Sequence, residues 1–338
     1  MKTFFHDEQR RHHPEIYFSR GKMRTPLEVP ERTDHLLAAA RACGLQIETP
    51  QDYGMAPLGA VHSQPYLRFL HSAHRRWHEL DGDWGEEVMS NIFVREPNAL
   101  RGILAEAARY QADGSSPIGR HTWGAAWWSA QSAVAGAEAL LGGERFAWAL
   151  CRPPGHHARA DAAGGFCYLN NAAIAAHHLS RHFKRVVVLD TDVHHGQGIQ
   201  EIFYDRSDVL YISTHGDTTN FYPGVSGHVD ERGEGEGYGY NLNLPMPHGS
   251  EESVFFDRLG EALDAIEVFE PEAVVLSLGF DIFEHDPQAQ VAVTTPGFAR
   301  LGEAVAGIGR PTLVVQEGGY YLEGLEANAV SFFEGLLR

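Results

Sequence analysis

Residues 185–198 read RVVVLDTDVHHGQG, a short apolar run that ends abruptly in acids, histidines and glycines. Four other runs share this form, each largely apolar and bounded by charge, proline or glycine. They are RFAWALC (145–151), DVLYIS (208–213), EAVVLSLG (272–279) and PTLVVQ (311–316). Because strands with both faces covered read as continuous apolar runs, these segments predict a buried parallel sheet.

Helical patterns lie between the predicted strands. Before the first of these runs, apolar residues recur in steps of four and three along one helical face, which we interpret as core packing. They are Trp123, Trp127, Ala130, Val134 and Ala137. Other helices are expected at 34–43, 65–79, 170–182, 252–268, 297–307 and 323–337. Alternating strands and helices predict a three-layer α/β fold, in one domain over 1–338, with a long loop excursion at 81–121.

Polar clusters follow each predicted strand, where open α/β sheets bind their ligands. Asp192 and His194 are two residues apart just after one run, so in extended backbone their side chains point to one face. Asp281, after another run, is the best candidate for a third ligand. Three protein ligands with an open fourth position are typical of a catalytic metal site. For Asp-x-His alone, a hydrogen-bonded turn is the alternative.

Two further clusters carry groups that suit hydrolysis. His156 and His157 follow Pro-Pro-Gly, in which the prolines fix the backbone and the glycine permits close approach. A rigid pair of imidazoles near a water that a metal polarises is what metal-assisted hydrolysis needs. Tyr320 follows two glycines and is a candidate hydrogen-bond donor to an oxyanion. An ordinary surface turn is the alternative for each cluster.

Composition narrows the class of partner. The 338 residues include 27 Lys and Arg against 45 Asp and Glu, a formal net charge of −18, which argues against nucleic acid. Such a surface would attract small cations, and the alternative is that the charge serves solubility alone. Cys43, Cys151 and Cys167 form no CxxC pair, which indicates a reducing compartment. Because the sequence shows neither a signal-like run nor a membrane-spanning stretch, we expect a cytoplasmic protein.

Six motifs resemble the histone deacetylase/acetylpolyamine amidohydrolase superfamily. They are RPPGHH (152–157), GFCYLNNAA (165–173), LDTDVHHGQG (189–198), FYPG (221–224), SLGFD (277–281) and EGGY (317–320). The resemblance implies an arginase-like α/β fold with about eight parallel strands. It implies Zn²⁺ bound by Asp192, His194 and Asp281. Fe²⁺ is an alternative, because two Asp and one His form a chemically harder ligand set than most zinc sites have. For catalysis it implies His157 as general base, His156 as its electrostatic partner or acid, and Tyr320 as the hydrogen-bond donor to the oxyanion. It implies Phe166 and Tyr222 as walls of the substrate tunnel. It also implies that Asp190 and Ser213 are ligands of a K⁺ ion.

One position departs from the family pattern. Gln197 stands where the family usually has Asp or Asn, at the position that bonds the residue matching His157. A neutral partner stabilises imidazolium less than a carboxylate does, which suits a base, although the longer side chain changes the geometry.

The expected reaction is deacetylation of a small cationic acetylated amine. Residues 1–120 look more like the bacterial acetylpolyamine amidohydrolases, which implies a homodimer. In the 81–121 excursion, Glu96, Glu106 and Asp113 are candidate ligands of a substrate ammonium group. The alternatives are deacylation of acetyl-lysine in proteins or of other small amides, an arginase-type hydrolase with two metals, and a non-catalytic binding protein.

Overall fold

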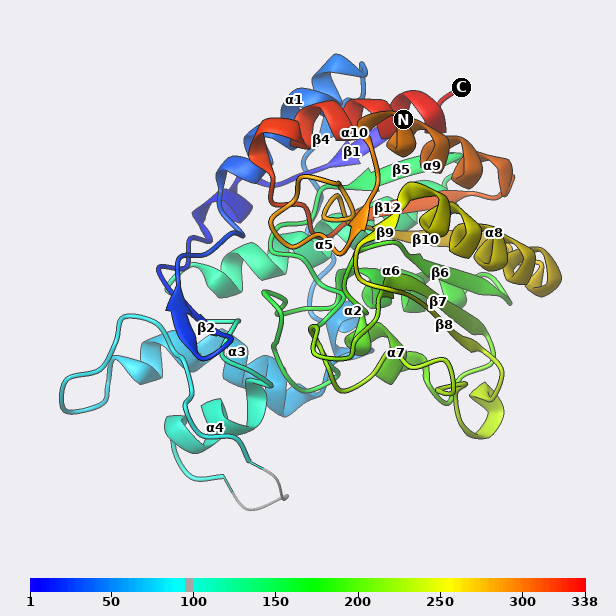
Figure 1. The fold of residues 1–338 in the computed structure, drawn as a ribbon. Helices are drawn as coiled ribbons and strands as arrows, with labels where there is room; N and C mark the ends of the chain where they lie inside the picture. The colour runs from blue at the N-terminus through cyan, green and yellow to red at the C-terminus, as the bar shows by residue number, and fades with distance from the viewer. Residues whose placement is uncertain (95–99) are drawn as a thin grey trace.

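Eight strands form one parallel sheet in the computed structural model, which describes residues 1–94 and 100–338 (Figure 1). The sheet order is β4-β1-β5-β12-β10-β6-β7-β8. The strands are β1 (Lys2–Phe4), β4 (Gln46–Glu48), β5 (Phe146–Ala149), β6 (Val186–Asp190), β7 (Val209–Gly216), β8 (Asn241–Met246), β10 (Ala273–Leu278) and β12 (Thr312–Gln316). The predicted three-layer fold is confirmed, and the five apolar runs are its long central strands.

Helices cover both faces of the sheet (Figure 1). Both faces need cover because successive side chains along each strand point to opposite faces, and those of the central strands are apolar on both. On β5, Phe146 and Trp148 face one layer while Ala147 and Ala149 face the other. The first layer contains α1 (Glu31–Ala42), α8 (Glu252–Phe269), α9 (Thr295–Gly307) and α10 (Leu322–Leu336). The second contains α2 (Ala56–Gly59), α3 (Gln64–Trp77), α5 (Thr122–Leu141), α6 (Asn171–Ser180) and α7 (Gln197–Phe203). No helix of the described residues is long and apolar enough to cross a membrane.

The 81–121 excursion is not the continuous loop that its weak periodicity predicted. Residues Ile103–Tyr110 form α4, which packs on α3 through buried Ile103 and Ala107. Val88 and Ile118 pair as an antiparallel bridge that closes the base of the excursion. With only eight residues, α4 is too short for helical periodicity to separate it from a loop.

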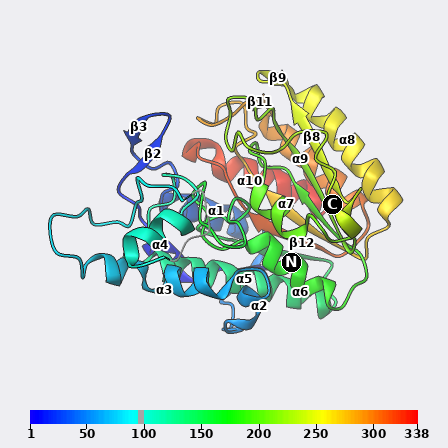
Figure 2. The ribbon, with the colours of Figure 1, turned by 90° about the horizontal axis from the view of Figure 1, so that it is seen from below.

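A hairpin near the N-terminus was not predicted either. Strands β2 (Tyr17–Ser19) and β3 (Lys22–Arg24) are joined at Arg20 and Gly21, whose φ angles of 51° and 73° give the left-handed backbone of a tight turn. Figure 2 shows this hairpin standing out from the body of the molecule. It forms one wall of the pocket described next.

Candidate active site

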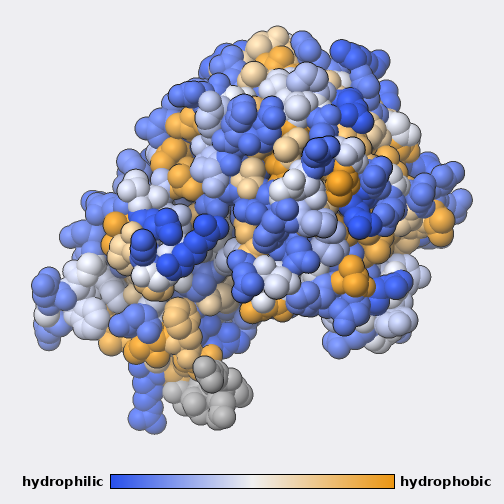
Figure 3. All heavy atoms as spheres, in the orientation of Figure 1, coloured by the Kyte–Doolittle hydropathy of each residue, from blue (hydrophilic) through white to orange (hydrophobic). Residues whose placement is uncertain are grey.

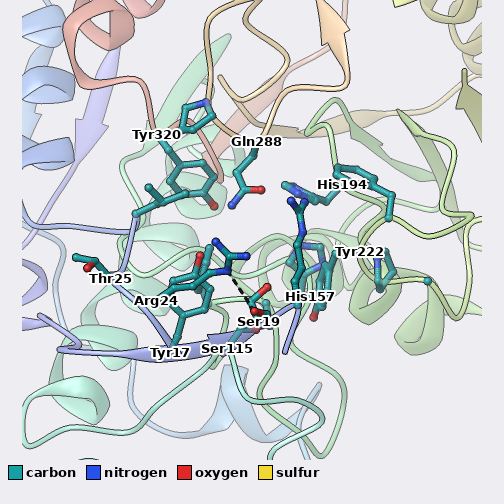
Figure 4. A pocket seen from close by; sticks show the side chains of 18 of the residues that line it. Tyr17, Ser19, Arg24, Thr25, Ser115, His157, His194, Tyr222, Gln288 and Tyr320 are labelled. Carbon is teal, nitrogen blue, oxygen red and sulfur yellow. Dashed lines mark hydrogen bonds between the residues drawn. The ribbon is translucent and has the colours of Figure 1, made fainter. Parts of the chain in front are cut away.

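A pocket of about 800 Å³ opens at the carboxyl edge of the sheet (Figure 4). One wall is the β2–β3 hairpin, and the others come from the loops that follow the central strands. The loop residues include His157, Phe166, His194, Tyr222 and Tyr320. The structure therefore gathers at one place side chains that the sequence placed after separate strands.

Asp192, His194 and Asp281 converge behind this pocket. They are buried, and one ligand atom from each lies within 4.8 Å of the others. Nδ1 of His194 is 3.1 Å from Oδ1 of Asp192 and 3.2 Å from Oδ2 of Asp281. Backbone N–H groups of Val193 and Gly318 donate to Asp281 and Asp192, which holds both carboxylates in place.

The surroundings of these carboxylates fit a divalent cation. A Cβ on Gly318 would lie 2.3 Å from Asp281 Oδ2 and 2.6 Å from Asp192 Oδ2, so only glycine leaves the space beside them free. Within residues 1–94 and 100–338, neither carboxylate pairs with Lys or Arg. Burial and the neighbouring Asp192 raise the pKa of Asp281 to about 7, a repulsion that a bound cation relieves.

The two histidines have opposite electrostatic surroundings although their ring centroids are 3.9 Å apart. Nδ1 of His156 lies 3.1 Å from Oδ2 of Asp190. Burial opposes its charge, but Asp192 and Asp190 raise the pKa of His156 to about 10. Burial and the adjacent His156 and His194 hold the pKa of His157 well below its usual value. These surroundings therefore disfavour a positive charge on the His157 ring.

Gln197 reaches His157 despite its extra length. Its Oε1 lies 2.7 Å from His157 Nδ1. Because an amide oxygen can only accept, a hydrogen on Nδ1 satisfies this contact, and in the neutral ring Nε2 is then without a hydrogen. The bond is possible because Gln197 is the first residue of α7 and is buried beside the site.

Buried groups outside the sequence prediction support the site. Glu317 accepts hydrogen bonds from the backbone N–H groups of Gly155 (2.7 Å) and His156 (3.1 Å) and from the Ser277 hydroxyl (2.8 Å). Arg32 donates to the carbonyls of Glu317 (2.6 Å) and Gly319 (2.7 Å). Its guanidinium lies 5.0 Å from the centre of the Tyr320 ring. These contacts fix the glycine loop that carries Tyr320.

Two of the predicted amine-binding acids, Glu106 and Asp113, do not line the pocket of this chain. Glu106 points to α3, where its carboxylate pairs with Arg76 at 2.5 and 2.8 Å, and it does not line this chain's own pocket. Its role as an amine ligand stays a prediction. Asp113 is close by, but its Oδ2 accepts from the Tyr222 hydroxyl at 2.6 Å. Glu96 lies outside the described residues.

Arginines of the hairpin line the pocket instead. Arg20 and Arg24 both lie in its wall, and no Asp or Glu lines it among the described residues. Figure 4 shows the Arg24 side chain extending from β3 over the pocket, with its Nε–H donating to the Ser19 carbonyl at 3.2 Å. The Arg20-Gly21 turn was the one sequence signal for this hairpin, and it carries no information about the distant strand ends that the hairpin contacts.

Comparisons with known proteins agree with this geometry. The histone deacetylase domain matches residues 26–336. The chain is 64% identical over 335 residues to an acetylpolyamine amidohydrolase of Burkholderia pseudomallei, covering 99% of this chain and 98% of that one. It is 36% identical over 340 residues to the acetylpolyamine amidohydrolase of Mycoplana ramosa, covering 99% of each.

Comparison with solved structures shows that the fold is similar to those of two known proteins. A crystal structure of the acetylpolyamine aminohydrolase from Burkholderia pseudomallei superposes with a TM-score of 0.98, at 64% identity, and covers 99% of this chain and 98% of that one. The HD domain of HDA15 superposes with a TM-score of 0.81 at 27% identity, covering 99% and 89%. From its sequence, its fold and the residues gathered at its carboxyl edge, this chain belongs to the histone deacetylase domain family.

Proposed function

We propose that the protein is a metal-dependent amidohydrolase that removes acetyl groups from small acetylated amines, releasing acetate and the free amine. The observation that carries the proposal is the buried set of Asp192, His194 and Asp281 at the pocket, next to His157, whose Nδ1 lies 2.7 Å from Gln197 Oε1. Relatives named acetylpolyamine amidohydrolases support the amine class of substrate.

In this proposal the chain's own groups divide the proton transfers. Asp192, His194 and Asp281 would hold a Zn²⁺ or Fe²⁺ ion, which would supply Lewis acidity for the carbonyl and the water. His157 accepts the water proton at Nε2 as the new C–O bond forms. The Tyr320 hydroxyl donates to the oxyanion, and a histidine of the pair protonates the leaving amine as the C–N bond breaks. Phe166 and Tyr222 flank the acyl chain.

We also propose a structural K⁺ site at Asp190 and Ser213. Both are fully buried behind the histidine pair. Oδ2 of Asp190 accepts from the Tyr211 hydroxyl at 3.0 Å, and Ser213 Oγ lies 2.8 Å from His215 Nδ1. Since these side-chain oxygens already have partners, backbone carbonyls supply the remaining ligands in this proposal.

The substrate proposal is tested by measuring kcat/KM on acetylated amines whose tails carry different numbers of ammonium groups. We expect kcat/KM for acetylputrescine to exceed that for acetylspermine by roughly five- to tenfold, because each added ammonium group meets Arg20 and Arg24. Arg24→Gln, which leaves Arg20 in place, should reduce this preference by about two- to threefold. Lys22→Gln removes the same charge from the same hairpin outside the pocket lining and should leave the ratio unchanged.

Other outcomes of this assay decide between the candidates. A higher kcat/KM on an acetyl-lysine peptide than on every acetylated amine would replace the proposal with protein deacetylation. Absence of acetate release from all substrates, with Zn²⁺ or Fe²⁺ supplied, would reject amide hydrolysis itself.

We further propose a homodimer that uses the 81–121 excursion. Its exposed apolar side chains support this, and Figure 3 shows apolar residues gathered over α4. Among the described residues of the excursion, the exposed large hydrophobic side chains are Trp84, Ile92, Phe93 and Leu104, which are 42%, 57%, 51% and 38% exposed. Replacing Ile92 and Phe93 by serine should convert a dimer into a monomer by light scattering. A monomeric mass for the unaltered protein would contradict the proposal.

A further inference from the structure

A hydrogen-bonded chain links the candidate general base to a carboxylate on the excursion. His157 Nδ1 lies 2.7 Å from Gln197 Oε1, and Gln197 Nε2 donates to the Tyr222 hydroxyl at 3.3 Å. The Tyr222 hydroxyl in turn donates to Asp113 Oδ2 at 2.6 Å. The four linked residues therefore come from segments far apart in the sequence, from Asp113 in the excursion to Tyr222 in the loop after β7.

The orientation of the Gln197 amide decides which nitrogen of His157 carries the hydrogen. With Oε1 toward the ring, Nδ1 carries the hydrogen and Nε2 is free to accept a proton. A flip of the amide by 180° would present N–H groups to Nδ1, which favours the opposite tautomer and blocks Nε2. Because the two ends of an amide have nearly the same shape, contacts at the other end of the side chain must select the orientation.

Asp113 supplies this selection. An ionised carboxylate has no hydrogen to donate, so the single hydrogen of the Tyr222 hydroxyl must point toward Asp113. The Tyr222 oxygen is then available only as an acceptor, and the Gln197 group facing it must be the N–H₂ end. Burial and Asp113 raise the pKa of Tyr222 well above its usual value, which keeps that hydroxyl protonated.

The carboxylate is itself held in place. Its Oδ1 accepts from the backbone N–H of Ser115 at 2.8 Å and from the Ser115 hydroxyl. Its Oδ2 also accepts from the Gly165 backbone N–H at 3.3 Å. A Cβ on Gly165 would lie 2.4 Å from the His157 ring and 2.8 Å from the Tyr222 hydroxyl, so the absence of a side chain there permits the close contact.

We propose that Asp113 is a positioning residue that sets the tautomer of His157 through Tyr222 and Gln197. This inference rests on the proposed role of His157 as base. It gives the excursion a part in catalysis that does not require contact with the substrate's amine. It also gives Tyr222 a polar function in addition to its place in the wall.

The test is a double-mutant cycle on zinc-loaded protein with acetylputrescine. Tyr222→Phe keeps the ring but removes the hydroxyl, and we expect kcat to fall roughly five- to twentyfold with KM within about twofold. In a Gln197→Glu background both terminal oxygens accept, so no amide orientation remains to be selected. The same Tyr222→Phe change should then alter kcat by less than about twofold.

A matched control separates this effect from simple loss of a buried hydrogen bond. The Tyr66 hydroxyl is also buried and donates a 2.6 Å bond, to the Tyr168 carbonyl, away from the pocket. Tyr66→Phe should leave kcat unchanged. Equal losses from Tyr222→Phe in the two backgrounds, or no loss in either, would overturn the proposal.

A readout independent of turnover completes the test. In protein carrying ¹⁵N-histidine, the His157 signals are identified by their absence in His157→Gln. Unaltered protein should show hydrogen on Nδ1, whereas Tyr222→Phe and Asp113→Ala should show a mixture of tautomers. An unchanged tautomer in a folded Tyr222→Phe protein would contradict the proposal while leaving deacetylation itself intact. Failure of the unaltered protein to release acetate would instead reject the proposed function.

Discussion

Asp281→Ala is expected to abolish both metal retention and turnover. Asp281 is one of three buried residues that could hold a metal ion, and its Oδ2 lies 3.2 Å from Nδ1 of His194. With two ligands left, metal content after dialysis should fall from about one ion per chain to below about a tenth. Turnover should fall by more than about 10³-fold, because the ion serves both the carbonyl and the water.

The control for this experiment is another aspartate that follows a strand of the same sheet. Asp217 comes directly after β7, outside the triad, and its Oδ1 accepts from the Thr219 backbone. Asp217→Ala should retain the ion and most of the activity. Metal content equal to that of the unaltered protein in Asp281→Ala, measured by elemental analysis of folded samples, would reject this residue as a ligand.

Tyr320→Phe should lower kcat by roughly 10²–10³ while metal content and KM stay near their original values. The ring will remain in place because Arg32 lies over it and Phe166 contacts it edge-on at 5.9 Å between centroids. Only the hydroxyl is lost, and its proposed hydrogen bond forms to charge that appears in the transition state. The change should therefore appear in kcat rather than in binding.

The neighbouring tyrosine offers a control one residue away. Tyr321 donates its hydroxyl to Glu323 at 2.9 Å on the surface. Tyr321→Phe should leave kcat unchanged. If Tyr320→Phe also leaves kcat unchanged, the Gly-Gly-Tyr segment is only a turn, and the oxyanion must be stabilised by other groups.

The sequence predicted the centre of the fold better than its edges. Long central strands such as β6 have every residue buried, so their apolar runs are unmistakable. Strands β1 and β4 have three residues each, and β8 buries Asn241 and Asn243, so none of them reads as an apolar run. Their places in the sheet depend on pairing partners that are distant in sequence.

The same distinction holds for the site. Asp192, His194, Asp281 and His157 could be proposed because the carboxyl ends of parallel strands meet at one edge, a rule that needs only local sequence. Arg32 could not, since its contact with Gly319 joins residues 287 positions apart. The charge of Glu106 alone does not show that Arg76, on an adjacent helix, pairs with both of its oxygens, so the sequence could not reveal this contact.

The position of β12 has a consequence for the order in which the molecule can be assembled during synthesis. Among the described strands it is the last to be made, yet it lies between β5 and β10. Until it emerges from the ribosome, β4-β1-β5 and β10-β6-β7-β8 are two separate groups with unpaired, apolar edges, which are prone to association with other chains. Gly318 and Tyr320 follow β12 within four residues, so the proposed metal site beside Gly318 is completed only with the closing strand. A growing chain therefore gains its sheet and its chemistry in the same late step.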